Sequence, residues 1–157
     1  MKIYLVQHAD AVAKDADPAR PLSDKGRLDC QRMASFLARS GVKAARVLHS
    51  GKQRALETAL LLASVIGPGN MVEEADGGLA PNDPTDRLME AIQTWPRDED
   101  VIVVGHLPFM NRMVSMLATG SEEAGAVDFE PGSVVCLQEN DDDWSVAWMV
   151  RPSLLGG

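Results

Sequence analysis

The chain begins with MKIYLVQHADA, residues 1–11. The apolar run at 3–6 has the length and composition of a buried β-strand, and it stops abruptly at Gln7 and His8. In open α/β sheets, ligands bind outside the carboxyl ends of the strands. A buried strand that ends on a polar pair is therefore the first indication of a site at a sheet edge.

Short apolar runs alternate with helical patterns along the rest of the chain. Strands are expected at 2–7, 46–49, 71–73 and 101–104, and a terminal hairpin at 133–138 and 144–150 around an Asp-rich turn. Helices are expected between Ser23 as N-cap and Gly41, and over 55–66, 88–95 and 109–117, with Pro108 in the first turn of the last. This order predicts an α/β fold: a three-layer α/β/α sandwich whose mostly parallel sheet has an antiparallel edge, in a single domain over 1–157.

Composition narrows the classes of function. The 157 residues are 45% hydrophobic and carry a net charge of −8, which argues against nonspecific nucleic-acid binding. The two cysteines have no CxxC spacing, the apolar run at the N-terminus is too short for a signal peptide's apolar region, and no segment approaches the length of a membrane span. We expect a cytoplasmic protein that binds neither nucleic acid nor membrane.

The three histidines of the chain, His8, His49 and His106, each follow or end a different predicted strand. Because the carboxyl ends of parallel strands share one edge, the three rings are expected at the same edge. Taken singly, His49 is more typical of a packed residue than of a catalyst. The joint pattern favours a functional role for His8 and His106.

An arginine close to this edge indicates an anionic ligand. Arg54 falls in the first turn of the second helix, where Ser50 is a candidate N-cap and the helix dipole is positive. The planar guanidinium suits phosphate oxygens, although a salt bridge from Arg54 to Glu57 is the alternative. Arg20 and Lys25 flank the start of the first helix and are candidates for additional positive charge.

Several established phosphate chemistries lack their sequence signatures. The chain has no G-x-x-x-x-G-K-[ST] loop, no G-x-G-x-x-G after a strand and no G-x-S-x-G elbow. It also has no aspartate pair of the kind that acts as a carboxylate nucleophile with magnesium, and no cysteine near an arginine-bearing loop. The nucleophile that remains at the edge is an imidazole.

Four sequence motifs, taken in their order along the chain, resemble those of a known protein family. YLVQHADA at 4–11, RPLSDKG at 20–26, HSGKQRALETA at 49–59 and VIVVGHLPFM at 101–110 resemble the histidine phosphatase superfamily, whose members include phosphoglycerate mutases. Within it the compact chain looks most like SixA-type phosphohistidine phosphatases. The resemblance implies a phosphoglycerate mutase-like fold and a phosphatase that needs no metal or other cofactor and acts through a phosphohistidine intermediate.

The resemblance also implies roles for individual residues. His8 matches the nucleophile, Arg54 the arginine that holds the phosphoryl oxygens, and His106 the second histidine, which contacts the phosphoryl group from the other side. Arg20 matches the arginine of the RPL segment, a further phosphate ligand. The first motif departs from the family's Arg-His-Gly, because Gln7 keeps N–H donors but carries no charge.

The implied substrate is a phosphorylated protein or a small phosphorylated molecule. An alkoxide leaving group needs a general acid, and the candidate is Asp83, which is alternatively the cap of the following helix. Without a clear acid, phosphohistidine on a partner protein is the favoured substrate. Two other functions stay open: a catalytically weak phosphoprotein-binding module, which the uncharged Gln7 motivates, and a metal hydrolase with a three-histidine site.

Overall fold

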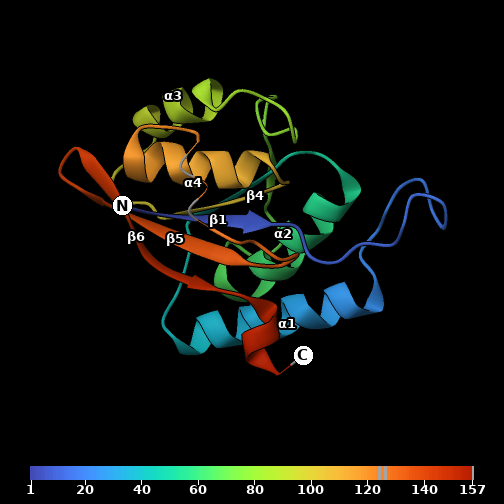
Figure 1. Cartoon of the computed structure of the whole chain (residues 1–157). Coiled ribbons are helices and arrows are strands. Elements are labelled where there is room, and N and C mark those ends of the chain that lie inside the picture. The colour runs from blue at the N-terminus through green and yellow to red at the C-terminus, as the bar shows by residue number, and fades with distance from the viewer. Residues whose placement is uncertain (124, 126, 157) are drawn as a thin grey trace.

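The computed structural model describes residues 1–123, 125 and 127–156. In this part of the chain, six strands form one sheet in the order β3-β2-β4-β1-β5-β6, with four α-helices and one short 3₁₀-helix around it (Figure 1). The elements are β1 (Lys2–Gln7), α1 (Asp24–Arg39), β2 (Arg46–His49), α2 (Gln53–Ile66), β3 (Glu73–Glu74), α3 (Asp86–Thr94), β4 (Val101–Gly105), α4 (Phe109–Thr119), β5 (Val134–Asn140), β6 (Asp143–Val150) and η1 (Pro152–Leu155).

The opening strand lies at the centre of the sheet. β1 pairs in parallel with β4, where Gln7 is opposite Gly105, and antiparallel with β5. β2 runs parallel to both β4 and β3, while β6 returns antiparallel to β5. The expected α/β fold, with a parallel centre and an antiparallel edge made by the terminal hairpin, is confirmed.

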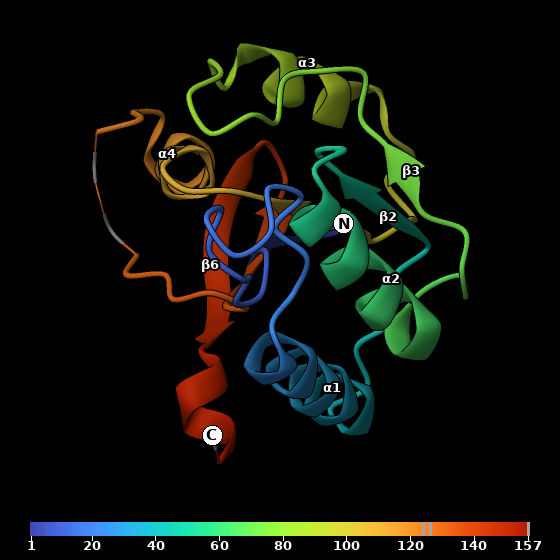
Figure 2. The same cartoon turned by 90° about the vertical axis from the view of Figure 1, so that its right-hand side faces the viewer.

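Helices cover both faces of the sheet and complete the three layers. Alternate side chains of β1 divide between two cores, with Ile3 and Leu5 packed on the α3 and α4 side, and Tyr4 and Val6 on the α1 and α2 side. Figures 1 and 2 show α4 and α3 above the sheet and α1 below it. Both faces of β1 are thus buried, which is why its sequence is continuously apolar.

The helices begin and end close to the predicted residues, except at the starts of α2 and α4. Ser23 is the N-cap of α1, as predicted, and its Oγ accepts a hydrogen bond from the Gly26 N–H at 3.0 Å. The expectation for Ser50 is wrong: α2 begins at Gln53 with Lys52 as N-cap. Pro108 is the N-cap of α4 rather than a residue of its first turn.

The third strand is shifted from the expected 71–73. β3 comprises only Glu73 and Glu74, both exposed, which pair with Leu48 and His49 of β2. Its position is set by backbone hydrogen bonds at the sheet edge and not by a buried apolar face. The apolar Met71, which motivated the prediction, is exposed.

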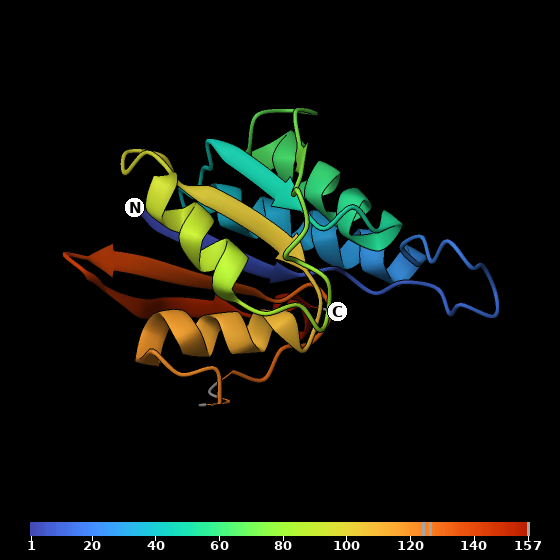
Figure 3. The same cartoon turned by 90° about the horizontal axis from the view of Figure 1, so that it is seen from above.

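The carboxyl ends of the central strands meet at one edge of the sheet. His49 lies opposite Val104, and Gln7 opposite Gly105, so the residues that follow β1, β2 and β4 are neighbours there. The segment 10–22 extends outward from this edge (Figure 3). In the described part of the chain, no helix has the length and apolar character that crossing a membrane requires.

Candidate active site

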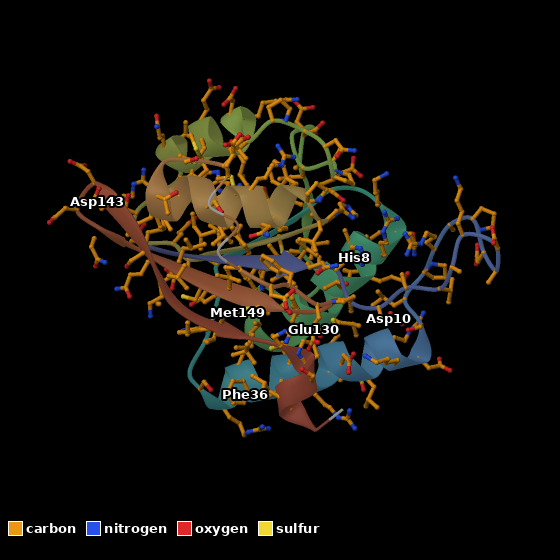
Figure 4. The ribbon with its side chains drawn as sticks, viewed as in Figure 1. His8, Asp10, Phe36, Glu130, Asp143 and Met149 are labelled. Carbon is orange, nitrogen blue, oxygen red and sulfur yellow. The ribbon has the colours of Figure 1, made fainter. Side chains whose placement is uncertain are left out.

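The His8 ring is fixed by the segment that follows β1. Its backbone N–H donates to the Gly105 carbonyl at 3.0 Å, and its Nδ1 lies 2.8 Å from the Ala9 carbonyl oxygen. Because a carbonyl oxygen only accepts, Nδ1 carries the proton and Nε2 keeps a free lone pair. The Ala9 N–H in turn donates to Thr58 Oγ1 at 3.0 Å, which ties this segment to α2. Figure 4 shows His8 at the carboxyl end of β1.

Arg54 reaches the free nitrogen of His8 from the first turn of α2. Its Nε donates to His8 Nε2 at 3.3 Å. The alternative ion pair with Glu57 is not formed, because the Glu57 carboxylate lies 3.0 Å from Arg27 instead. The guanidinium is therefore available at the atom that the sequence assigns as the nucleophile.

His106 follows β4 and completes the pair of rings. The centroids of the His8 and His106 rings are 5.1 Å apart, with their planes inclined at 51°. His106 is buried, and its Nε2 lies 2.6 Å from the Ser50 hydroxyl oxygen. Its Nδ1 is buried and has no hydrogen-bond partner among the described residues. The two imidazoles thus converge from different strands, as the sequence predicted.

Both imidazoles are neutral at neutral pH. Burial, with the positive charges of Arg54 and Arg20, lowers the pKa of His8 from 6.5 to about 4. Burial, the His8 ring and the charges of Arg54 and Lys52 lower the pKa of His106 to about 3. A neutral His8 has the lone pair that a nucleophile needs.

A further positive charge near the two rings comes from Arg20. Arg20, in the extended 10–22 segment, donates from Nε to the Val12 carbonyl at 3.1 Å, and its charge lowers the pKa of His8, His106 and Arg54. Lys25 is not part of this cluster, because its ammonium binds Asp29 at 2.7 Å. The site is therefore electropositive although the whole chain carries a charge of −8.

Gln7 is the last residue of β1 and precedes His8 directly. It is 9% exposed, and its side-chain Oε1 is buried without a hydrogen-bond partner among the described residues. An unpartnered buried amide oxygen is costly, which favours a partner that arrives with a ligand or water. Gln7 is thus placed beside the site but adds no charge to it.

Two of the sequence alternatives, the three-histidine metal site and Asp83 as a helix cap, lose their support. His49 Nδ1 accepts a hydrogen bond from the Gly51 N–H at 3.1 Å. Within residues 1–123, 125 and 127–156, no three His, Cys, Asp or Glu side chains form a group that could hold a metal ion. Asp83 does not cap α3, whose N-cap is Thr85; its Oδ2 accepts from the Ala80 N–H at 2.9 Å within its own loop.

Sequence reasoning missed three contributors to the site. Ser50 contacts His106, Lys52 adds positive charge near that ring, and Thr58 holds the Ala9 backbone. All three lie in the 49–59 motif, so their proximity to Arg54 was the signal available. Ser50 was taken for a helix cap because a serine shortly before a helix is compatible with either role.

Comparisons with known proteins bear on this arrangement. No protein-family model matches the chain. An uncharacterized protein of Picosynechococcus sp. is 26% identical over 156 residues, which cover 91% of this chain and 93% of that protein.

Solved structures give a closer likeness in fold. The protein histidine phosphatase SixA complexed with tungstate superposes with a TM-score of 0.87 at 23% identity, covering 99% of both chains. The alpha-ribazole phosphatase from Shigella flexneri has a TM-score of 0.78 at 14% identity, covering 97% of both chains. The chain therefore has the fold of the histidine phosphatase superfamily, as its four motifs predicted.

Proposed function

We propose that this protein is a phosphatase that transfers a phosphoryl group first to His8 and then to water. One observation carries the proposal: the unprotonated Nε2 of a neutral, buried imidazole lies 3.3 Å from an arginine Nε. A tetrahedral anion drawn to that guanidinium is brought to the lone pair that would attack it. The match of fold and motifs to the histidine phosphatases supports the same reading.

In the first step, His8 Nε2 forms a bond to phosphorus while the bond from phosphorus to the leaving group breaks. Such a transfer depends on in-line positioning and on positive charge around the equatorial oxygens. Arg54 and Arg20 supply that charge, and Lys52 adds to it from the amino end of α2. The Ala9 carbonyl, bonded to Nδ1–H, stabilises the imidazolium character that develops on His8.

In the second step, water attacks phosphorus and the bond from phosphorus to His8 Nε2 breaks, which releases inorganic phosphate. We assign His106, whose ring centroid is 5.1 Å from that of His8, to the oxygens of the phosphoryl group, the contact that the resemblance implies. A bound dianion raises the proton affinity of His106, so that the ring can gain a proton in the complex. Ser50 keeps Nε2 of that ring oriented in the free protein.

The substrate that we propose is phosphohistidine on a partner protein. Alkyl phosphates need a general acid at the leaving oxygen, and the candidate Asp83 is bound to a backbone N–H in its own loop. An imidazole leaves from phosphorus far more readily than an alkoxide. A site with two neutral histidines is suited to that leaving group.

The experiment compares three substrates: a protein phosphorylated on histidine, p-nitrophenyl phosphate and an alkyl phosphate. We expect kcat/KM for phosphohistidine to exceed that for the alkyl phosphate by at least about 100-fold, the usual contribution of a general acid. His8→Ala should abolish turnover, while His49→Asn, at the same edge but outside the cluster, should retain it. Activity should survive a chelator.

The alternative of a phosphoprotein-binding module makes a different prediction in the same experiment. Gln7 in place of the family's arginine motivates it, because one charge is missing at the site. If titration calorimetry detects phosphate binding while none of the three substrates turns over, the binding module is correct and the phosphatase is wrong.

A further inference from the structure

A cavity lies at the opposite end of β1 from His8. It has a volume of about 380 Å³ and lies among the start of β1, the end of α1 and β6. Its aromatic walls come from Tyr4, Phe36 and Trp148, and the Tyr4 and Trp148 rings are 5.9 Å apart. Figure 4 shows Phe36 and His8 on separate parts of the molecule. The volume is in the range of small-molecule sites.

Several polar groups face this cavity without a protein partner. The Tyr4 hydroxyl and the ammonium groups of Lys2 and Lys43 have no hydrogen bond or ion pair with any described residue. Burial, together with the charges of Cys136 and Asp100, raises the pKa of Tyr4, which keeps its hydroxyl protonated and able to donate. Unpartnered donors in a half-enclosed aromatic cavity are the features that orient a bound ligand.

The charge of the cavity favours an anion. The cavity is lined by two lysines, Lys2 and Lys43, and by one carboxylate, that of Asp100. The Asp100 Oδ1 already accepts a hydrogen bond from the Lys2 backbone N–H at 2.8 Å. The carboxyl end of α1 opposes an anion, but amides of Ser40, Gly41 and Val42 bind the terminal carbonyls and reduce that effect. The cavity is thus locally positive on a chain of net charge −8.

We propose that this cavity binds a small planar aromatic acid, with its ring packed against the wall that Tyr4, Phe36 and Trp148 form and its carboxylate toward Lys2 and Lys43. Ring stacking and apolar burial provide the attraction, and the lysines select the charge. The site is independent of the phosphatase activity, since it shares no residue with the cluster around His8.

Three probes with the same ring and different charge test the proposal: indole-3-acetate, the neutral indole-3-ethanol and the cationic tryptamine. They are titrated into ¹⁵N-labelled protein and followed by NMR. We expect indole-3-acetate to bind with a Kd at or below about 1 mM, the affinity typical of so small a ligand. Its shifts should be confined to the Trp148 indole N–H and the amides of Gly41, Val42 and their neighbours.

The order of the three affinities is the deciding result. Indole-3-acetate should bind about fivefold more tightly than the neutral probe, as one partly screened ion pair allows, and tryptamine most weakly. Lys43→Gln should remove most of this preference, whereas Lys14→Gln, an exposed lysine elsewhere, should leave it unchanged. No binding of any probe, equal affinities, or shifts around His8 instead would overturn the proposal.

Discussion

Gln7 is the residue at which this site differs most from the motif it resembles. It lies next to the proposed nucleophile, is nearly buried, and has an unpartnered side-chain oxygen. An arginine there would join Arg20 and Arg54, so in the absence of an anion three guanidinium groups would repel one another. The glutamine lowers that repulsion and also weakens the attraction for phosphate.

We therefore predict opposite effects of Gln7→Arg with and without phosphate. A charge at about 4 Å in a medium of dielectric near 20 interacts by up to about 4 kcal/mol, and screening reduces this, so we expect roughly tenfold tighter phosphate binding. The melting temperature should fall in phosphate-free buffer and recover when phosphate is added. Gln7→Met is the matched control, because it replaces the amide with another long side chain that carries no charge. If Gln7→Arg binds phosphate no better than wild type, Gln7 does not face the anion.

The imidazoles of His8 and His106 predict a dependence of stability on pH. Both folded pKa values, about 4 for His8 and about 3 for His106, lie below the ordinary value of 6.5. At pH values between the folded pKa of each ring and 6.5, the unfolded chain binds protons that the folded chain does not. The folded state therefore loses stability as the pH falls below about 6.5, by up to about 1.4 kcal/mol per pH unit for each ring.

Urea unfolding at pH values from 7 to 5 measures this slope. His106→Gln removes one titrating ring, so the free energy of unfolding of that variant should fall less steeply with decreasing pH than that of wild type. Equal slopes for the two proteins would mean that His106 titrates alike in the folded and unfolded chains, and the neutral state assigned to it would be wrong.

At the scale of the elements, α1 is held closely against the segment that follows β1. A Cβ built at Gly26 would lie 2.0 Å from the Asp10 carbonyl oxygen, which is backbone and cannot move away alone. Gly26→Ala should therefore lower stability by about 2 kcal/mol or more, although alanine is the better helix former by about 1 kcal/mol.

Thermal unfolding checks this prediction, with Ser35→Ala as the control at an exposed position of the same helix. Phosphatase activity should fall with Gly26→Ala as well, because the displaced segment begins at His8. A melting temperature that is unchanged or raised would show that the close approach of α1 to Asp10 does not constrain the fold.

The elements also show what the sequence predicted and why. β1 and β4 were predicted almost residue for residue, because both are buried on two faces and read as continuous apolar runs. The prediction of β3 was displaced because its two exposed glutamates carry no apolar pattern, and the strand is held by its backbone pairing and by an ion pair from Glu73 to Arg46 of β2. Ser50 was misassigned because its partner, His106, is 56 residues away in the sequence.

At the scale of the whole molecule, topology explains how a −8 chain contains an electropositive site. The parallel pairing of β1, β2 and β4 brings His8, His106 and the start of α2 to one edge. The convergence of His8, Arg54 and His106 was predictable from strand ends and motif order. The orientation of each ring was not, because it depends on contacts such as those of the Ala9 carbonyl and the Ser50 hydroxyl, which only the fold brings into place.

The central claim is that His8 Nε2 receives the phosphoryl group. The most direct measurement mixes the protein with a phosphohistidine protein, stops the reaction in alkali within milliseconds to seconds, and locates phosphate on the peptides by mass spectrometry. We predict a transient phosphoryl group on His8 that forms and decays at rates consistent with turnover. Turnover without phosphorylated His8, or a phosphoryl group on a different residue, would contradict the claim.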